Sequence, residues 1–261
     1  MFSFFILYPV FWNIISSFKT NTEFLTNQLA WPKGLAWDNY VRAFQKANVG
    51  DYFFNSLFIV VASTFFLLIF VIPTSYVLAR FRFFGSRVIE SLFMTCVFIQ
   101  AAYIMVPLYV QMNRLHMTDS LWSLSLVYAI LNFPFSIFLL SGYMRSIPKS
   151  YGEAAYIDGC SNWGILLKII IPLVKSGIAT VTMLSAMGFW NEYPLALVLI
   201  RTSAKKTLPV GLAHLYQVQR RATDFGALFA ALVIVLIPTI IIYLVGQKSL
   251  LKGIGAGGIK E

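Results

Sequence analysis

The chain has 261 residues, of which 59% are hydrophobic and only 11% are charged, and its mean hydropathy is +0.76. A soluble domain carries about a quarter charged residues, so this composition excludes a soluble globular protein and indicates a protein embedded in a lipid bilayer. The net charge of +10 does not indicate nucleic-acid binding, because the basic residues fall mainly in loops and at the ends of apolar runs, as in membrane proteins.

Six apolar runs are candidates for crossing a hydrocarbon core of about 30 Å, which takes roughly 20 helical residues. The first run is short, but it has neither the basic leader nor the cleavage site of a signal peptide. The sequence predicts an all-α polytopic membrane protein of six transmembrane helices in a single domain, residues 1–261. The predicted spans are residues 2–18, 53–79, 88–111, 121–143, 173–200 and 226–246.

Polar connections of different character separate these runs. Residues 19–52 contain a short helix predicted to lie at the membrane interface, residues 80–87 form a basic loop, and residues 201–225 form a polar connection with five basic residues. The predicted faces share the 20 basic residues evenly. The positive-inside rule therefore orients the chain only weakly, through the basic loop compared with the single arginine of residues 113–120.

The polar loop 144–171 carries several local signals for helix starts and stops. Pro148 suits the first turn of a short helix, where its missing N–H is not needed. Gly159 permits a sharp backbone reversal, and Ser161 or Asn162 can cap a second helix. We therefore expect a helix–glycine–helix elbow that projects from the membrane.

The same loop contains the run Glu153-Ala154-Ala155, then Gly159 after three residues, then Ile169-Ile170-Ile171-Pro172 after nine more. This spacing resembles the signature loop of binding-protein-dependent ABC importer permeases, which reads E-A-A, three residues, G, nine residues, I-x-L-P. The departure is Ile171, where the family prefers leucine. A bare E-A-A is common, but the spaced glycine and proline make the match specific. The resemblance covers nearly the whole chain and is closest to the sugar-importing, maltose-type branch.

The resemblance implies the type I ABC importer permease fold, with the loop 144–171 and both termini in the cytoplasm of a bacterial or archaeal cell. It implies that the first helix of the elbow is a coupling helix, which sits in a groove of an ATPase subunit. Family members carry more residues before the first span, so the sequence is expected to begin inside a longer chain. The residues expected to couple the chain to the ATPase subunits are Glu153, Ala154, Ala155, Asp158, Gly159 and Pro172.

The resemblance also implies the partners. These are a related second permease, two ATP-binding cassette subunits, an extracytoplasmic sugar-binding protein and a carbohydrate substrate. The sequence has no Walker A motif, so ATP and Mg are expected to bind the ATPase subunits, and no cofactor or metal is expected in this chain. The enzyme motifs H-E-x-x-H and G-x-S-x-G are also absent from the sequence, so no catalytic residue is predicted.

Glu192 is the main candidate for the translocation pathway, because a carboxylate in or near the end of a span is costly and usually faces a cavity or a partner. With Trp190 and Asn191 it forms a W-N-E segment that resembles the one in sugar permeases and offers an aromatic face and hydrogen-bonding groups. Packing by interhelical hydrogen bonds is the alternative for the weaker candidates, and gating rather than sugar binding is the alternative for the whole chain. The weaker candidates are Gln100, Tyr103 and Asn132.

The tail, residues 247–261, is polar and glycine-rich. It resembles the sugar-permease ending Q-x-x-x-x-x-G-x-x-x-G-A-x-K, with departures at Gly258 and Ile259. In maltose-type systems this tail reaches between the ATPase subunits, which implies contacts by Gly253, Gly257 and Lys260. A frayed polar end is the alternative.

Three other functions are alternatives to a sugar-importing permease. A permease of the same superfamily for a non-sugar solute, such as a polyamine or phosphate, is disfavoured by the W-N-E segment, the run at residues 207–212 and the tail. A self-sufficient secondary transporter predicts inverted repeats or several membrane acids, and the sequence shows no repeat and one main acid, Glu192. An intramembrane enzyme lacks a motif. The favoured interpretation is the permease subunit of an ATP-driven carbohydrate importer.

Overall fold

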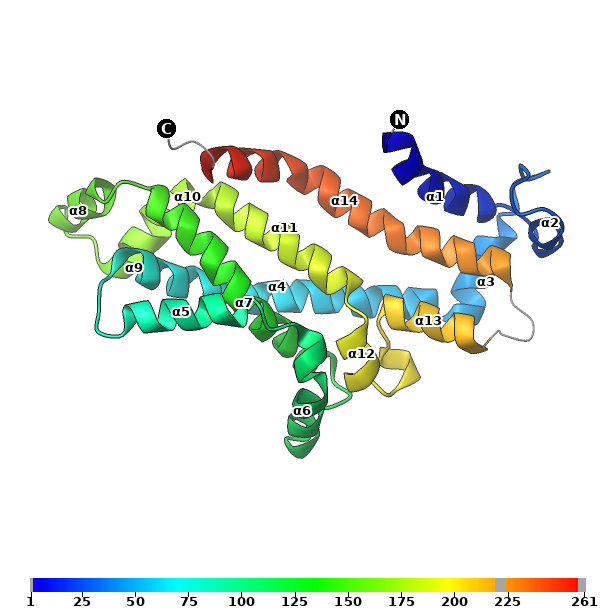
Figure 1. Ribbon diagram of the computed structural model, residues 1–261, viewed down its shortest axis with the longest axis horizontal. Coiled ribbons are helices and arrows are strands. Elements are labelled where there is room, and N and C mark those ends of the chain that lie inside the picture. The colour runs from blue at the N-terminus through cyan, green and yellow to red at the C-terminus, as the bar shows by residue number, and fades with distance from the viewer. Residues whose placement is uncertain (1, 219–223, 258–261) are drawn as a thin grey trace. The chain divides into compact units, whose positions relative to one another are not determined.

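The computed structural model describes residues 2–218 and 224–257, and every regular element in these ranges is a helix (Figure 1). This confirms the predicted all-α class. The chain divides into two compact units. Unit 1 comprises Met1–Phe58, Asp119–Leu121 and Asn191–Ile241, and unit 2 comprises Ile59–Thr118, Trp122–Trp190 and Ile242–Glu261.

Unit 1 combines short helices with parts of two long ones. A 3-10 turn, Ser203–Lys205, precedes α13. The helices are α1 (Phe2–Ser16), α2 (Asn21–Thr26), α3 (Asp38–Ala47), the start of α4 (Val49–Arg80), α12 (Pro194–Leu199), α13 (Leu208–Val218) and most of α14 (Phe225–Gly257).

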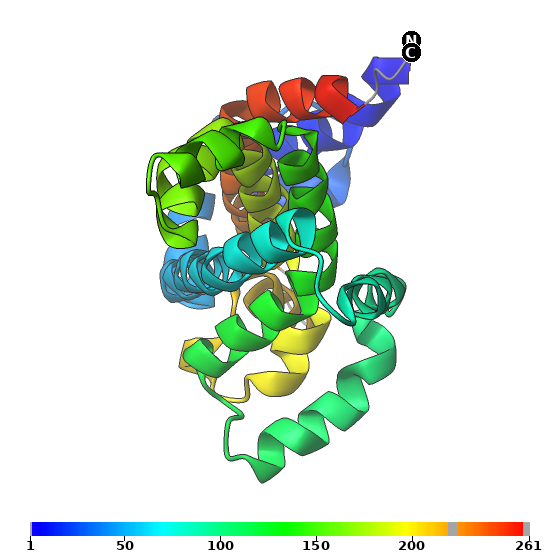
Figure 2. The ribbon, with the colours of Figure 1, turned by 90° about the vertical axis from the view of Figure 1, so that its left-hand side faces the viewer.

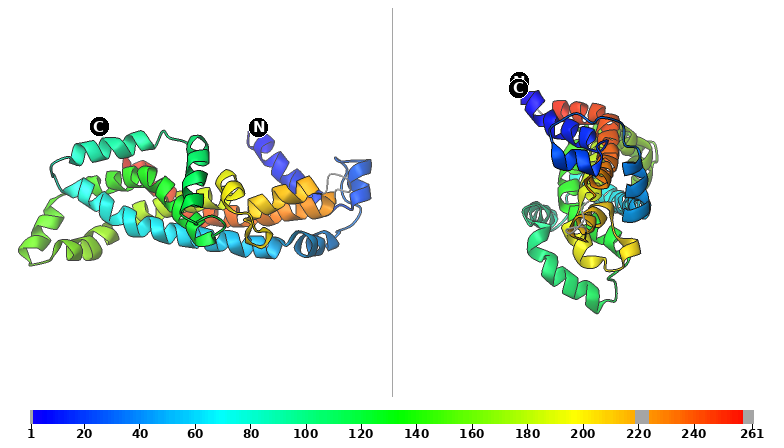
Figure 3. Two further views of the ribbon diagram at one scale, coloured as in Figure 1. Left: turned by 90° about the horizontal axis from the view of Figure 1, so that it is seen from below. Right: turned by 90° about the vertical axis from the view of Figure 1, so that its right-hand side faces the viewer.

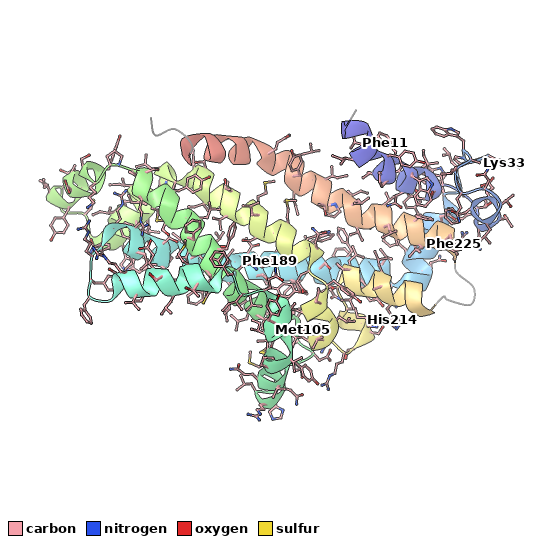
Figure 4. The ribbon with its side chains drawn as sticks, in the orientation of Figure 1. Phe11, Lys33, Met105, Phe189, His214 and Phe225 are labelled. Carbon is pink, nitrogen blue, oxygen red and sulfur yellow. The ribbon has the colours of Figure 1, made fainter. Side chains whose placement is uncertain are left out.

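An aromatic cluster holds α2 against α1 and α14 in unit 1. Phe24 of α2 is buried, and its ring centroid lies 4.9 Å from those of Phe225 and Phe229 and 6.0 Å from that of Trp12. Figure 4 labels Phe225, at the start of α14. Trp12 also meets Phe229 edge to face at 5.2 Å. Aromatic pairs at such distances contribute about 0.5–1.5 kcal/mol each beyond the burial of their area. The cluster therefore fixes how the first helices of unit 1 pack.

A polar network joins α3 to its neighbours in the same unit. Arg42 donates from Nε to Oδ2 of Asp224 at 2.8 Å and from Nη2 to Oδ1 of Asn39 at 2.5 Å. The amide of Asn39 is buried and donates to the backbone carbonyls of Ser17 and Lys19. Because buried amides are costly without partners, this network specifies one position for α3.

Unit 2 contains most of the long apolar helices and the elbow. A π-helical turn, Leu166–Ile170, lies between α9 and α10. The helices are the rest of α4, α5 (Ser86–Cys96), α6 (Ala101–Arg114), α7 (Leu121–Ser146), α8 (Ser150–Ile157), α9 (Asn162–Ile165), α10 (Ile171–Leu173) and α11 (Lys175–Asn191).

The helices of unit 2 approach closely through small residues. A Cβ added at Gly177 of α11 would lie 2.6 Å from Cγ of Tyr143 in α7, so the two backbones meet at a distance that only glycine permits. Tyr128 of α7 also stacks on Phe189 of α11 at 5.8 Å. Small residues at helix contacts are typical of membrane proteins, where van der Waals packing replaces the hydrophobic drive. Fully buried serines in α4 and α7 follow the same rule: Ser63, Ser75, Ser125 and Ser136.

The six predicted spans correspond to helices of different length and continuity. In the part of the chain that the structure describes, α4, α7 and α14 are long and apolar enough to cross a membrane, and two bent helix pairs raise the count to five. The predicted first span is α1, whose 15 residues extend about 22 Å at 1.5 Å per residue.

The predicted third span is broken. It consists of α5 and α6, which meet at an angle of 102° (Figure 3). Residues 97–100, between the two helices, contain neither glycine nor proline, and Pro107 lies inside α6. The bend therefore has no local breaker residue that the sequence could have revealed.

The predicted fifth span is also interrupted, at Val174 and again at residues 192–193. The segment Asn162–Leu173 bends by 77° relative to α11. The second break has a local cause. A proline disfavours helical geometry at the residue before it, and Pro194 begins α12. The predicted polar connection 201–225 likewise contains a helix, α13, in which Leu208 and Val210 are buried.

The sixth predicted span, residues 226–246, falls on the apolar segment Phe225–Leu244 of α14. Helix α14 continues to Gly257, because residues 247–252 include neither proline nor glycine and lysine and leucine favour helix. The start of the predicted tail is therefore helical. Gly253 and Gly257 lie in α14, and Lys260 lies outside the described residues.

Candidate functional site

The elbow of α8 and α9 is the best-defined candidate site (Figure 2). Helix α8 begins at Ser150, two residues after Pro148, and ends at Ile157. Two hydrogen bonds close its C-terminus. The N–H of Gly159 donates to the carbonyl of Tyr156 at 3.0 Å, and the N–H of Cys160 donates to that of Ala155 at 2.9 Å.

This pair of bonds is a Schellman motif, which requires a left-handed residue after the C-cap. Gly159 occupies that position with φ = +81°, and a Cβ added there would have no atom within 4 Å. The constraint on this residue is therefore conformational rather than steric. The predicted reversal at Gly159 is present in the structure.

The second arm of the elbow begins with a side-chain cap, as predicted. The hydroxyl oxygen of Ser161 accepts a hydrogen bond from the N–H of Gly164 at 3.2 Å. After α9, the N–H of Ile171 donates to the carbonyl of Leu166, five residues earlier, which makes the turn π-helical. Sequence reasoning missed this turn. Pro172, which lacks an N–H, was the only signal near it.

The two faces of α8 differ in exposure. Glu153 and Ala154 are exposed, as are Asp158 and Gly159 in the turn that follows, whereas Ala155 is 5% exposed and packs inward. The structure thus separates the two alanines that the sequence motif treats alike. It also adds exposed apolar residues that the motif did not indicate: Tyr156, Ile157 and Trp163.

A pocket of about 360 Å³ lies against α8 within unit 2. Glu153, Tyr156 and Ile157 line it from α8, and Tyr76 and Arg80 line it from the end of α4. The carboxylate of Glu153 thus borders a hollow with mixed aromatic and cationic walls. Such a surface suits a protein side chain better than a bilayer.

The three residues of the W-N-E segment differ in their hydrogen bonds and in their exposure. Glu192 accepts hydrogen bonds from the backbone N–H groups of Leu195 at 2.7 Å and Ala196 at 3.1 Å, and so caps α12. Trp190 is 1% exposed and does not present its ring to solvent. Asn191 is exposed.

The weaker pathway candidates all lie in unit 2. Gln100 precedes α6, and Tyr103 lies in its first turn; both side chains are exposed. The amide of Asn132 donates to the backbone carbonyl of Tyr128 within α7 at 3.1 Å. This bond lies within one helix, so it is not the interhelical hydrogen bond of the packing alternative.

Sequence reasoning missed a cluster centred on Asp119, in the turn before α7. One carboxylate oxygen accepts from the backbone N–H groups of Arg201 and Thr202 at 3.0 and 2.9 Å, and the other accepts from the hydroxyl of Thr202 at 2.6 Å. Lys205 adds an ion pair at 3.3 Å. Asp119 has a positive φ of 57°, a conformation that aspartate and asparagine tolerate better than most residues.

We expect Asp119→Asn to destabilise the protein by about 2 kcal/mol, because hydrogen bonds to a charged group contribute about 1.5–3 kcal/mol and asparagine keeps the backbone preference. The hydrogen bonds from Thr202 hold the pKa of Asp119 below its usual value of 3.8. A lowered pKa adds stability above the usual value, and this stability is lost as the pH falls.

Thermal unfolding of the purified protein in detergent tests this expectation. The difference in unfolding temperature between wild type and Asp119→Asn should be largest at pH 7 and shrink progressively below about pH 4. Asp51→Asn is the matched control, because Asp51 is an exposed carboxylate. A difference that does not change with pH would show that the charge of Asp119 does not contribute.

The comparison with protein families identifies the chain. The family described as "Binding-protein-dependent transport system inner membrane component" matches residues 48–255. The chain belongs to this family. It is therefore a multi-pass inner-membrane component of a binding-protein-dependent transport system, as the sequence predicted.

Several relatives of this family member have carbohydrate names. It is 34% identical to a probable starch degradation products transport system permease protein of Thermoanaerobacterium thermosulfurigenes, over 97% of this chain and 91% of the relative. It is 31% identical to a diacetylchitobiose uptake system permease protein of Streptomyces coelicolor, over 97% of this chain and 83% of the relative. It is 33% identical to a multiple sugar-binding transport system permease protein of Streptococcus mutans, over 98% of this chain and 92% of the relative.

Solved structures agree with the family assignment. The crystal structure of a bacterial ABC transporter involved in the import of the acidic polysaccharide alginate matches with a TM-score of 0.83 and 28% identity, over 95% of this chain and 91% of that chain. A second alginate transporter structure, in complex with an alginate pentasaccharide-bound periplasmic protein, matches with a TM-score of 0.69 at 12% identity. The second match supports the fold alone.

Proposed function

We propose that this chain is the permease subunit of an ATP-driven importer of carbohydrates in the cytoplasmic membrane of a bacterium or archaeon. The elbow is the observation that supports this proposal. The exposed carboxylate of Glu153 and the backbone reversal at Gly159 are the features that a docking helix needs. The carbohydrate substrate is supported by the names of the starch-product, diacetylchitobiose and multiple-sugar relatives.

The proposed complex contains a related second permease, two ATP-binding cassette subunits and an extracytoplasmic sugar-binding protein. ATP and Mg bind the ATPase subunits, and this chain performs no chemistry. Helix α8 docks on one ATPase subunit through Glu153, Ala154 and Asp158, while Ala155 packs inward to hold the helix. Gly159 sets the angle of the elbow, and the segment ending at Pro172 connects it to α11.

For the translocation pathway, we assign a role along the path to only some of the candidate residues. We propose that Glu192 acts by positioning the break between α11 and α12, beside the exposed Asn191, and that Gln100 and Tyr103 offer exposed polar groups along the path. Trp190 and Asn132 contribute packing. Gly253 and Gly257 would then reach the ATPase subunits on α14, and Lys260 is proposed to contact the same subunits.

Reconstitution tests the proposed function. The chain is purified with its companion permease, ATPase subunits and binding protein and placed in liposomes that contain ATP. We expect uptake of a labelled maltose-type oligosaccharide only with ATP and the binding protein. Uptake of polyamine or phosphate instead would favour the non-sugar permease, and uptake driven by an ion gradient without ATP would favour a secondary transporter.

A further inference from the structure

A second pocket in unit 2 lies where α4 turns into α5. It has a volume of about 580 Å³, and residues of the turn, the start of α5, the end of α7 and the segment before α8 line it. Its cationic lining residues are Arg80, Arg82, Arg87, Arg145 and Lys149, and it contains one carboxylate, Glu90.

The charges of this pocket are not balanced. Glu90 is paired with Arg145, whose Nη2 lies 2.6 Å from its Oε1. The other four cationic side chains have no acidic partner within the ranges that the structure describes. Since like charges gathered in one hollow repel one another, the pocket favours an anion with several acceptor oxygens.

Arg80 lies between this pocket and the pocket against α8 and lines both. Its Nε and Nη2 atoms are buried and have no hydrogen-bond partner among the described residues. A guanidinium held out of water without acceptors is costly. An anion held by the neighbouring cations would offset part of this cost through its charge, and the exposed guanidinium groups of Arg82 and Arg87 have the fork that matches phosphate geometry.

The rim of the pocket is apolar on one side. Phe83 and Val88 line it and are exposed, and the neighbouring Phe84 is fully exposed. Gly85 turns the chain between them with φ = +84°. Exposed aromatic residues beside cations are typical of the membrane interface, where rings meet acyl chains and cations meet headgroups.

We propose that this pocket binds the phosphate of an anionic phospholipid, with the acyl chains against Phe83, Phe84 and Val88. A free phosphate would satisfy the cations equally well but would leave the apolar rim without a partner. Basic pockets between membrane helices are known to take such headgroups. Lys149 also lines the pocket against α8, so a bound headgroup would lie directly beside the elbow.

The test uses the permease complex in detergent with mixed micelles of cardiolipin and phosphatidylcholine, and it measures retained lipid by native mass spectrometry. The variant Arg82→Gln/Arg87→Gln removes two exposed cations of the pocket. The matched control, Lys168→Gln/Lys175→Gln, removes two exposed cations of the same unit that do not line it. We expect the pocket variant to retain cardiolipin about tenfold less well than wild type, and the control to match wild type.

A charge-preserving variant, Arg82→Lys/Arg87→Lys, should keep most of the retention. Equal retention of cardiolipin by the pocket variant and wild type would overturn the proposal. Binding of inorganic phosphate with no preference for cardiolipin over phosphatidylcholine would assign the pocket to a soluble anion instead. Unchanged lipid retention together with loss of the ATPase subunits would make it a protein contact.

Discussion

Gly159→Val is expected to uncouple ATP hydrolysis from uptake while the protein still inserts and assembles. The residue holds a φ of +81° with open space around its missing Cβ, so an added Cβ meets no neighbouring atom. Valine instead imposes a backbone strain of about 1–3 kcal/mol, because β-branched residues rarely adopt positive φ. That strain favours opening the two hydrogen bonds of the Schellman motif, and α8 would then present a different face.

Gly159→Asn is the matched variant, because asparagine adds a side chain yet tolerates the left-handed region. In the reconstituted complex we expect uptake to fall about tenfold or more for valine and to stay near wild type for asparagine. Assembly is checked by co-purification of the ATPase subunits. Normal uptake by the valine variant would remove the elbow from the coupling mechanism, and equal loss in both variants would attribute the effect to side-chain volume.

Glu192→Ala is expected to lower transport by about tenfold while leaving assembly intact, because a helix cap contributes about 1–2 kcal/mol. Both carboxylate oxygens already accept backbone hydrogen bonds at the start of α12. Without them, two N–H groups at the break lose their acceptors, and the short helix α12 loses the negative charge that favours its N-terminus.

The variant Glu192→Gln separates the cap from the charge. Its amide oxygen can still accept hydrogen bonds from the start of α12, so we expect transport well above that of the alanine variant. If glutamine is as inactive as alanine, the negative charge itself is required along the path. Normal transport by Glu192→Ala would exclude the segment from the pathway, and failure to assemble would make Glu192 a structural residue.

The elbow was predictable because its signals are local. Gly159 and Ser161 each act on backbone groups within four residues, through the Schellman bonds and the cap. The spacing of the signature loop then identified the family, and the family match confirmed it. Helix α12 also had a local signal in Pro194, but the prediction counted residues 173–200 as one continuous span.

The features that the sequence did not predict depend on contacts between residues that are distant in the chain. Asp119 binds groups 82 to 86 positions further along the chain, so composition and periodicity carry no trace of it. The bend between α5 and α6 lacks a breaker residue, and the exposure that separates Ala154 from Ala155 follows from packing. A pattern of residue types predicts that a helix forms, but its neighbours decide where it bends and which face it shows.

The π-helical turn before Pro172 sets the rotational phase of the elbow. A π-helical turn contains one residue more than an α-helical turn, and each residue of an α-helix advances about 100° around the axis. If the same residues were wound as an α-helix, the extra residue would no longer be taken up within one turn, and everything before it, α8 included, would be rotated about 100° relative to α10. The direction in which Glu153 points therefore depends on how this turn is wound as well as on residue type, and a chain one residue shorter here could keep the same direction with an ordinary α-helical turn.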